Sequence, residues 1–119
     1  MTFRVVGKAV PRIEGEDKVT GRTLYAADVV FPDALWGKVL RSPLPHAKIV
    51  RVDASKARAL PGVRAALTGE DLPPVYVGSR MKDMPVLARE RARFVGDPVA
   101  AVAAESPEFA EEALNLIDV

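Results

Sequence analysis

The sequence contains no cysteine, and this absence removes two classes of site at once. Disulfide bonds and thiolate metal sites, iron–sulfur ligation included, need cysteine side chains, so neither can be built from these 119 residues. Histidine is almost as scarce, because His46 is the only one. No apolar run approaches the roughly 20 residues that a membrane-spanning helix needs. The N-terminus also lacks the apolar segment of a signal peptide. We therefore expect a soluble protein of the cytoplasm.

An excess of charge of one sign is missing as well. The chain carries 17 basic and 16 acidic residues, which gives a net charge of +1. Such a balance offers no electrostatic case for binding nucleic acid or an anionic membrane surface. What the chain does have is apolar content, at 49% of its residues. That content and the length of 119 residues predict one domain with a packed core.

The clearest pattern lies near the C-terminus. An apolar run at residues 99–105, bounded by turn residues, predicts a strand covered on both faces. Ser106 then has the position of a helix N-cap, with Pro107 at the first helical residue and Glu108 in the first turn. The predicted buried helix face consists of Ala110, Ala113, Leu114 and Ile117, and the predicted solvent face of Glu108, Glu111, Glu112 and Asn115. We expect residues 117–119 to begin a further strand.

The earlier part of the chain gives weaker signals. Residues 4–22 look extended, with a possible short strand at 4–6 and surface coil at 14–18. The predicted strands are residues 23–28, 35–41, 47–53 and 63–68, and a proline-rich corner between the second and third predicts that these two pair antiparallel. A short helix at 53–60, capped by Asp53 or Ser55, ends at Pro61. Residues 75–91 read mostly as a loop. The expected fold class is α+β, with a mixed sheet, one short helix and one long helix.

Residue by residue, the chain shows no catalytic set. His46 follows two prolines, and we interpret it as a turn histidine that bonds nearby backbone. Ser42 lies four residues away, so a Ser/His nucleophile pair is an alternative, although no Gly-x-Ser-x-Gly turn exposes the serine. Gly96 precedes a strand and not a helix, so we do not interpret it as part of a phosphate site. We expect it to permit either an unusual backbone angle or close packing. The acidic pairs at 16–17 and 70–71 are expected to be solvated.

Several motifs in a fixed order resemble a known family. They are GKAVPR at 7–12, DKVTG at 17–21, YAAD at 25–28, LWGKVLRSPLPHAKI at 35–49, DASKA at 53–57, LPGV at 60–63 and VGDPVAAVAAE at 95–105, followed by Ala110 and Ala113. This order resembles the N-terminal α/β-hammerhead domain of the molybdopterin-binding large subunit of the xanthine dehydrogenase and aldehyde oxidase family. Asp97 departs from that pattern, in which a glutamate is expected.

The resemblance implies a role within a much larger enzyme. Such subunits use a molybdenum–pterin cofactor to hydroxylate aldehydes, purines or N-heterocycles, and pass electrons to iron–sulfur clusters and often FAD on partner domains or subunits. The family's cofactor-binding and catalytic residues lie in later domains, so none is expected among residues 1–119. The chain is thus expected to be a fragment, a single hammerhead domain that is inactive alone and self-associates through apolar surface that the rest of the subunit would cover.

Two questions about its role stay open at this point. The best interface candidates lie in the proline corner and are Arg41, Ser42, Pro43, Pro45 and His46. Two prolines make this corner rigid and able to present side chains to a partner, or the corner only turns one strand into the next. The alternative to a domain of a larger subunit is a freestanding module that binds a small ligand or a protein at an open sheet edge.

Overall fold

The computed structural model describes residues 3–119. Its backbone contacts divide the chain into two compact units, Met1–Asp33 and Ala34–Val119. Among the described residues no helix is both long and apolar enough to cross a membrane.

The first unit contains little regular structure. A short helix α1 (Gly15–Val19) occupies part of the stretch predicted as coil, and the 3-10 helix η1 (Ala26–Asp28) lies where a strand was predicted at 23–28. Both predictions were wrong, as was the possible strand at 4–6, which is bend and turn. Acidic residues in the first turn of α1 and Lys18 in its last turn interact favourably with the helix dipole. The sequence-based prediction did not take this charge pattern into account. The Tyr25 N–H donates to Asp28 Oδ2 at 2.8 Å, which closes the turn of η1.

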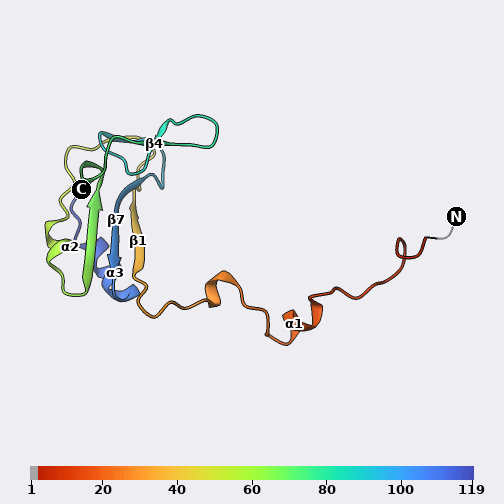
Figure 1. The fold of residues 1–119 in the computed structure, drawn as a ribbon. Coiled ribbons are helices and arrows are strands. Elements are labelled where there is room, and N and C mark those ends of the chain that lie inside the picture. The colour runs from red at the N-terminus through yellow and green to blue at the C-terminus, as the bar shows by residue number, and fades with distance from the viewer. Residues whose placement is uncertain (1–2) are drawn as a thin grey trace. The chain divides into compact units, whose positions relative to one another are not determined.

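The second unit is built on a three-stranded sheet. Its order is β1 (Trp36–Arg41), β7 (Pro98–Ala104), β3 (Val63–Thr68), with β7 in the centre and antiparallel to both neighbours (Figure 1). The strands expected at 35–41, 63–68 and 99–105 are confirmed. All strand pairings among the described residues are antiparallel. The sheet therefore lacks the parallel pairs that the predicted mixed sheet would contain.

Two-residue strands complete the second unit. β2 (Ala47–Lys48) pairs with β6 (Arg91–Ala92), and β4 (Tyr76–Val77) pairs with β5 (Met84–Pro85). The strand predicted over 47–53 is therefore much shorter than expected, and it pairs with β6 and not with β1. A proline-rich corner turns the chain away from β1, and the partner of β2 comes from residues far along the sequence. The 75–91 stretch is mostly loop, as predicted.

Two helices cover one face of the sheet. α3 (Pro107–Asn115) begins at Ser106, whose Oγ accepts a hydrogen bond from the Phe109 N–H at 3.2 Å, as the sequence predicts. α2 (Ser55–Ala59) packs against β3 and α3, and Asp53 Oδ1 accepts from the Ser55 N–H at 2.9 Å (Figure 1). The core between helices and sheet is rich in alanine and consists of Ala54, Ala57, Ala66, Ala100, Val102, Ala104, Ala110, Ala113 and Ile117. The α+β class and the predicted buried face of α3 are confirmed.

The C-terminal residues return to the start of α2. Asp118 forms an isolated antiparallel bridge with Asp53, with N–H···O distances of 2.8 and 3.0 Å. This bridge agrees with the expectation that extended backbone follows α3. Gly62, at φ +87°, makes the predicted break after α2, and the Phe109 ring lies so close that a Cβ at Gly62 would approach it to 2.6 Å.

Candidate functional site

The corner after β1 is held at its first residue. The Ser42 N–H donates to the Asp97 carbonyl at 2.9 Å, and the Gly96 N–H donates to the Ser42 carbonyl at 2.8 Å. The Arg41 guanidinium adds a bond to the Gly96 carbonyl at 2.9 Å. Gly96 has φ +92°, which confirms the unusual backbone angle expected of it. The turn before β7 therefore fixes the point at which the corner begins.

The Ser42 hydroxyl is used within the corner itself. Its Oγ accepts from the Leu44 N–H at 3.1 Å and lies 3.0 Å from the Leu44 carbonyl, to which it donates. Ser42 is only 7% exposed. No hydrogen bond joins the Ser42 and His46 side chains anywhere in the part of the chain that the structure describes. A serine whose hydroxyl closes a local turn and is not bonded to the histidine lacks the geometry of an activated nucleophile.

The rest of the corner faces solvent. Pro43, Pro45 and His46 are exposed, and the Leu44 side chain between the two prolines is 53% exposed. An apolar side chain held outward by a pinned, proline-flanked backbone loses little conformational entropy when it binds a surface. The corner thus presents exposed side chains on a backbone that is fixed at its base.

Asp97 has a structural role that the sequence reading did not find. The side chain is 3% exposed, and its Oδ2 accepts a hydrogen bond from the Arg93 N–H at 2.9 Å. Because the Asp97 carbonyl also binds Ser42, one residue ties the loop before β7 to the corner. The signal that could have found it is a charged residue inside an otherwise apolar, turn-bounded segment, since buried charges require partners.

Two cavities flank the segment that follows the corner. One, of about 550 Å³, lies between residues 46–52 and the segments 68–70 and 88–91. The other, of about 760 Å³, is bordered by residues 40–44, by 47–51 and by the C-terminal residues 117–119. His46 borders the first cavity, whereas Arg41, Ser42 and Pro43 border the second. The structure therefore spreads the five corner residues around one exposed projection and does not gather them into a single pocket.

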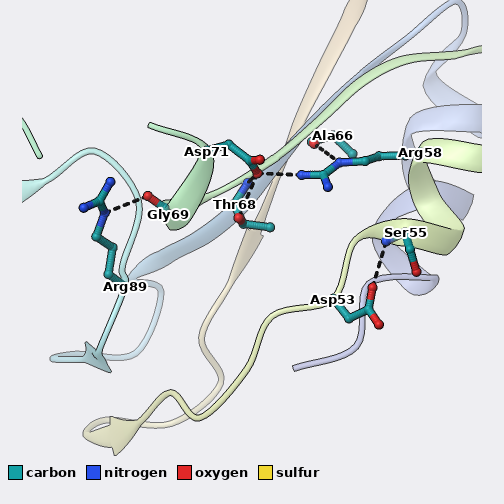
Figure 2. Close-up of polar contacts among 8 residues, drawn as sticks. All are labelled: Asp53, Ser55, Arg58, Ala66, Thr68, Gly69, Asp71 and Arg89. Carbon is teal, nitrogen blue, oxygen red and sulfur yellow. Dashed lines mark hydrogen bonds and ion pairs between the residues drawn. The ribbon is translucent and has the colours of Figure 1, made fainter. Parts of the chain in front are cut away.

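A polar network supports the wall of the first cavity. Asp71 Oδ2 accepts three hydrogen bonds: from the Thr68 N–H at 2.7 Å, the Thr68 hydroxyl at 2.8 Å and Arg58 Nη2 at 2.6 Å (Figure 2). Arg58 Nε also donates to the Ala66 carbonyl at 2.9 Å. Asp71 belongs to the 3-10 helix η2 (Gly69–Asp71). It was predicted to be merely solvated, and that was wrong, because the Thr-x-x-Asp spacing is a capping box.

These hydrogen bonds change the titration of two carboxyl groups. The Thr68 N–H, then its hydroxyl, and then the Arg58 guanidinium lower the pKa of Asp71 from its ordinary value. Hydrogen bonds from Ser55 lower the pKa of Asp53 at the start of α2 (Figure 2). Both groups are therefore ionised at neutral pH and act as acceptors, which is a structural and not an acid–base function.

Gly69 permits a close approach beside this network. Arg89 Nε donates to the Gly69 carbonyl at 2.7 Å (Figure 2). The Arg89 guanidinium also donates to the Leu72 carbonyl. A Cβ at position 69 would lie 2.7 Å from Arg89 Cγ and 2.8 Å from the Ala88 carbonyl oxygen. Only glycine fits here without displacement of the 88–89 backbone.

The described residues do not fit a metal centre. No three side chains of the His, Cys, Asp or Glu type are placed together across residues 3–119 so that they could hold a metal ion. The sequence supplies no thiolate either.

Comparison with known proteins identifies the family. The family model described as "Aldehyde oxidase and xanthine dehydrogenase, a/b hammerhead domain" matches residues 20–119. The chain belongs to this family. It is 50% identical over 109 residues to a probable xanthine dehydrogenase subunit of Bacillus subtilis, a match that covers 91% of the chain and 15% of that relative. It is 42% identical over 118 residues to the nicotinate dehydrogenase large molybdopterin subunit of Eubacterium barkeri, and this match covers 98% of the chain and 28% of that relative.

Solved structures of the family have the same hammerhead fold. Quinoline 2-oxidoreductase from Pseudomonas putida 86 superposes with a TM-score of 0.84 at 39% identity, over 94% of this chain and 15% of that one. The Cu,Mo-CO dehydrogenase superposes with a TM-score of 0.86 at 38% identity, over 94% of this chain and 15% of that one. The chain is therefore a hammerhead domain of the aldehyde oxidase and xanthine dehydrogenase family, and this finding favours a domain of a larger subunit over a freestanding module. It spans well under a third of the length of these relatives.

Proposed function

We propose that this hammerhead chain is a structural and interface domain within a longer molybdenum hydroxylase subunit and is not catalytic by itself. The observation that carries the proposal is the asymmetry of the matches: relatives cover 91% and 98% of this chain, whereas the chain covers 15% and 28% of them. The family model matches residues 20–119, which comprise the whole second unit and residues 20–33 of the first. We extend the proposed single hammerhead domain to residues 1–119, because the relatives align over 91% and 98% of the chain.

We place the cofactor outside these residues. The longer subunit is expected to bind a molybdenum–pterin cofactor, because the Eubacterium barkeri relative is by name a molybdopterin subunit and the CO dehydrogenase contains molybdenum. When bound, that group supplies hydroxylation of an aldehyde, purine or N-heterocycle. We further propose that partner domains or subunits would hold iron–sulfur clusters, and in some cases FAD, to accept the electrons, and that the complex works in the cytoplasm. The proposed contribution of residues 3–119 is packing surface, of which the exposed corner is one part.

The corner of Arg41, Ser42, Pro43, Pro45 and His46 is the proposed contact with neighbouring domains or subunits. Support comes from its construction: the two hydrogen bonds of the Ser42 backbone fix its base, and its outer residues face solvent. A pinned corner presents its side chains in one arrangement, so a partner surface meets a preorganised contact.

Metal and pterin analysis tests the functional proposal. A longer gene product read through past Val119 and the 119-residue chain are purified side by side, and their molybdenum and pterin contents are measured. We expect both groups in the longer product and neither in the 119-residue chain. A longer product without molybdenum would refute the assignment to a molybdenum hydroxylase.

A substitution in the corner tests the interface proposal separately. In the longer subunit, His46→Ala should reduce the recovery of partner subunits in co-purification, because it removes a side chain from the proposed contact. His46 is exposed and lies outside the core, so the substitution should leave the fold intact. Val50→Ala is the matched control, since Val50 is 88% exposed but lies outside the corner. Unchanged recovery with His46→Ala, and likewise with Leu44→Ser, would show that the corner only turns the chain.

A further inference from the structure

The two faces of the central sheet differ in what covers them. In a strand, side chains alternate between faces, and residues paired across strands share a face. One face carries Ala66, Ala100, Val102 and Ala104, all of which are buried. The helices α2 and α3 pack on this sheet (Figure 1). On the same face Lys38 forms an ion pair with Glu111 of α3, which confirms which side the helix covers. The chain's own helices therefore complete this layer of packing.

The opposite face is apolar and open. The register aligns two rows across the three strands: Gly37, Ala103 and Ala65 in one, and Val39, Ala101 and Leu67 in the other. Val39 is 39% exposed and Leu67 40% exposed. The central alanines are half-buried, and Ala65 is exposed. We call these six residues the open sheet face. Val99, on the same side of β7, is buried, so the open sheet face begins at Ala101.

From the sizes of its side chains, we infer that the row of Val39, Ala101 and Leu67 on the open sheet face forms a shallow trough. Alanines on the central strand lie low, whereas Val39 and Leu67 stand on the strands at either side. A Cβ added at Gly37 would meet no atom closer than the Val102 carbonyl oxygen at 3.9 Å, so this row has room for an incoming side chain. None of the six residues is charged or polar. The trough therefore suits aliphatic side chains and offers no partner to a polar group.

We propose that an apolar segment of the large subunit's own polypeptide, from the part outside these 119 residues, packs onto the open sheet face and forms a third layer over β1, β7 and β3. The inference rests on the proposed function. Its occupant is indicated by length, because the chain covers only 15% of the Bacillus subtilis relative and of the quinoline 2-oxidoreductase chain, so most of each such polypeptide lies elsewhere.

The size of the open sheet face favours a covalently linked occupant. Six small and medium side chains expose on the order of a few hundred Å², well below the roughly 800 Å² per partner that a stable interface between separate molecules buries. A segment of the same polypeptide is present at high effective concentration, so a small apolar contact is sufficient to hold it. A second copy of the chain would need a larger surface than this one.

Thiol labelling tests the proposal in both forms of the protein. The chain has no native cysteine, so Leu67→Cys gives the 119-residue chain a single thiol on the open sheet face. Its rate of reaction with a maleimide is compared with the rate of the same residue in the longer subunit, read by mass spectrometry of the labelled peptide. We expect labelling at least about tenfold slower in the longer subunit, because a covered thiol reacts only when its cover opens.

Glu112→Cys serves as the matched control, since Glu112 is exposed on the outer side of α3. Protection of Leu67→Cys that exceeds that of Glu112→Cys supports the inference. Equal reactivity of Leu67→Cys in the two forms overturns it. Protection already present in the 119-residue chain also overturns it, and loss of that protection on dilution would identify a second copy as the occupant.

Molybdenum content keeps the two proposals apart. A longer subunit that holds molybdenum but leaves Leu67→Cys reactive refutes the docking inference alone. A longer subunit that lacks molybdenum yet protects Leu67→Cys refutes the proposed function and leaves the docking inference standing.

Discussion

Asp71 offers the sharpest test of how this fold is held together. Its Oδ2 accepts three hydrogen bonds, from the backbone and hydroxyl of Thr68 and from Arg58, and these link η2 and β3 to α2. Asp71→Asn keeps the shape of the side chain but removes its charge. A hydrogen bond to a charged group contributes about 1.5–3 kcal/mol, whereas an exposed ion pair contributes about 0.2–1 kcal/mol. Because the asparagine oxygen still accepts part of the set, we expect a loss of about 1–2 kcal/mol at pH 7.

The sign of the pH dependence follows from the lowered pKa of Asp71. A carboxyl group whose pKa is lower in the folded than in the unfolded protein stabilises the fold fully when the pH is above its unfolded-state pKa, which is about 3.9 for aspartate. That stabilisation is lost as the pH falls through the folded pKa. The difference in unfolding free energy between the wild type and Asp71→Asn should therefore be constant near neutral pH and should shrink below about pH 4.

Urea unfolding, followed by the fluorescence of Trp36, measures both quantities. Glu70→Gln is the matched control, because it removes a neighbouring carboxylate that forms no hydrogen bond or ion pair among the described residues, and we expect it to change stability by less than about 0.5 kcal/mol. The reasoning fails if Asp71→Asn is as stable as the wild type at pH 7, if Glu70→Gln costs as much, or if the difference persists unchanged at low pH.

Three further predictions concern other parts of the molecule. Gly69→Ala should lower the free energy of urea unfolding by about 1–3 kcal/mol, because its Cβ would lie 2.7 Å from Arg89 Cγ. Gly37→Ala should be tolerated, since the nearest atom to its Cβ would be 3.9 Å away. Equal losses of stability in the two variants would contradict this account. Ser106→Ala removes the N-cap of α3 and should lower the unfolding free energy by about 1 kcal/mol, and an unchanged thermal midpoint would show that the cap contributes nothing. Ser42→Ala should leave the hydrolysis of an activated ester at the buffer rate, as in the wild type; turnover by the wild type that disappears in the variant would restore the hydrolase hypothesis.

The C-terminal strand and helix were predictable because their signals are local. The apolar run of β7, the cap at Ser106 and the spacing of Ala110 and Ala113 each act within a few residues, and the structure has all three. The short strand β2 was overpredicted for the opposite reason. Its extent depends on a partner, β6, that lies far along the chain, and no local pattern in 47–53 reveals how few residues that partner can pair.

The contact residues of the candidate site were only partly accessible to sequence reasoning. The corner itself was predictable from its prolines, but the residue that ties it down, Asp97, binds across the fold to Arg93 and Ser42, and neither contact follows from a motif. Asp71 is different, since Thr68 and Asp71 have the spacing of a capping box and the signal was available. In the first unit, α1 was missed because a five-residue helix gives too short a pattern for periodicity to show.

The central position of β7 has a consequence for how the domain is assembled. β1 and β3 both pair with β7, and neither pairs with the other. Since β7 follows both in the sequence, a ribosome must complete residues 98–104 before either earlier strand gains a sheet partner. Until then the nascent chain presents two unpaired strands with apolar side chains, the state in which association between chains is most harmful. Of these three strands, the last to be synthesised is thus the one that joins the other two, and folding of this sheet is expected to wait for it.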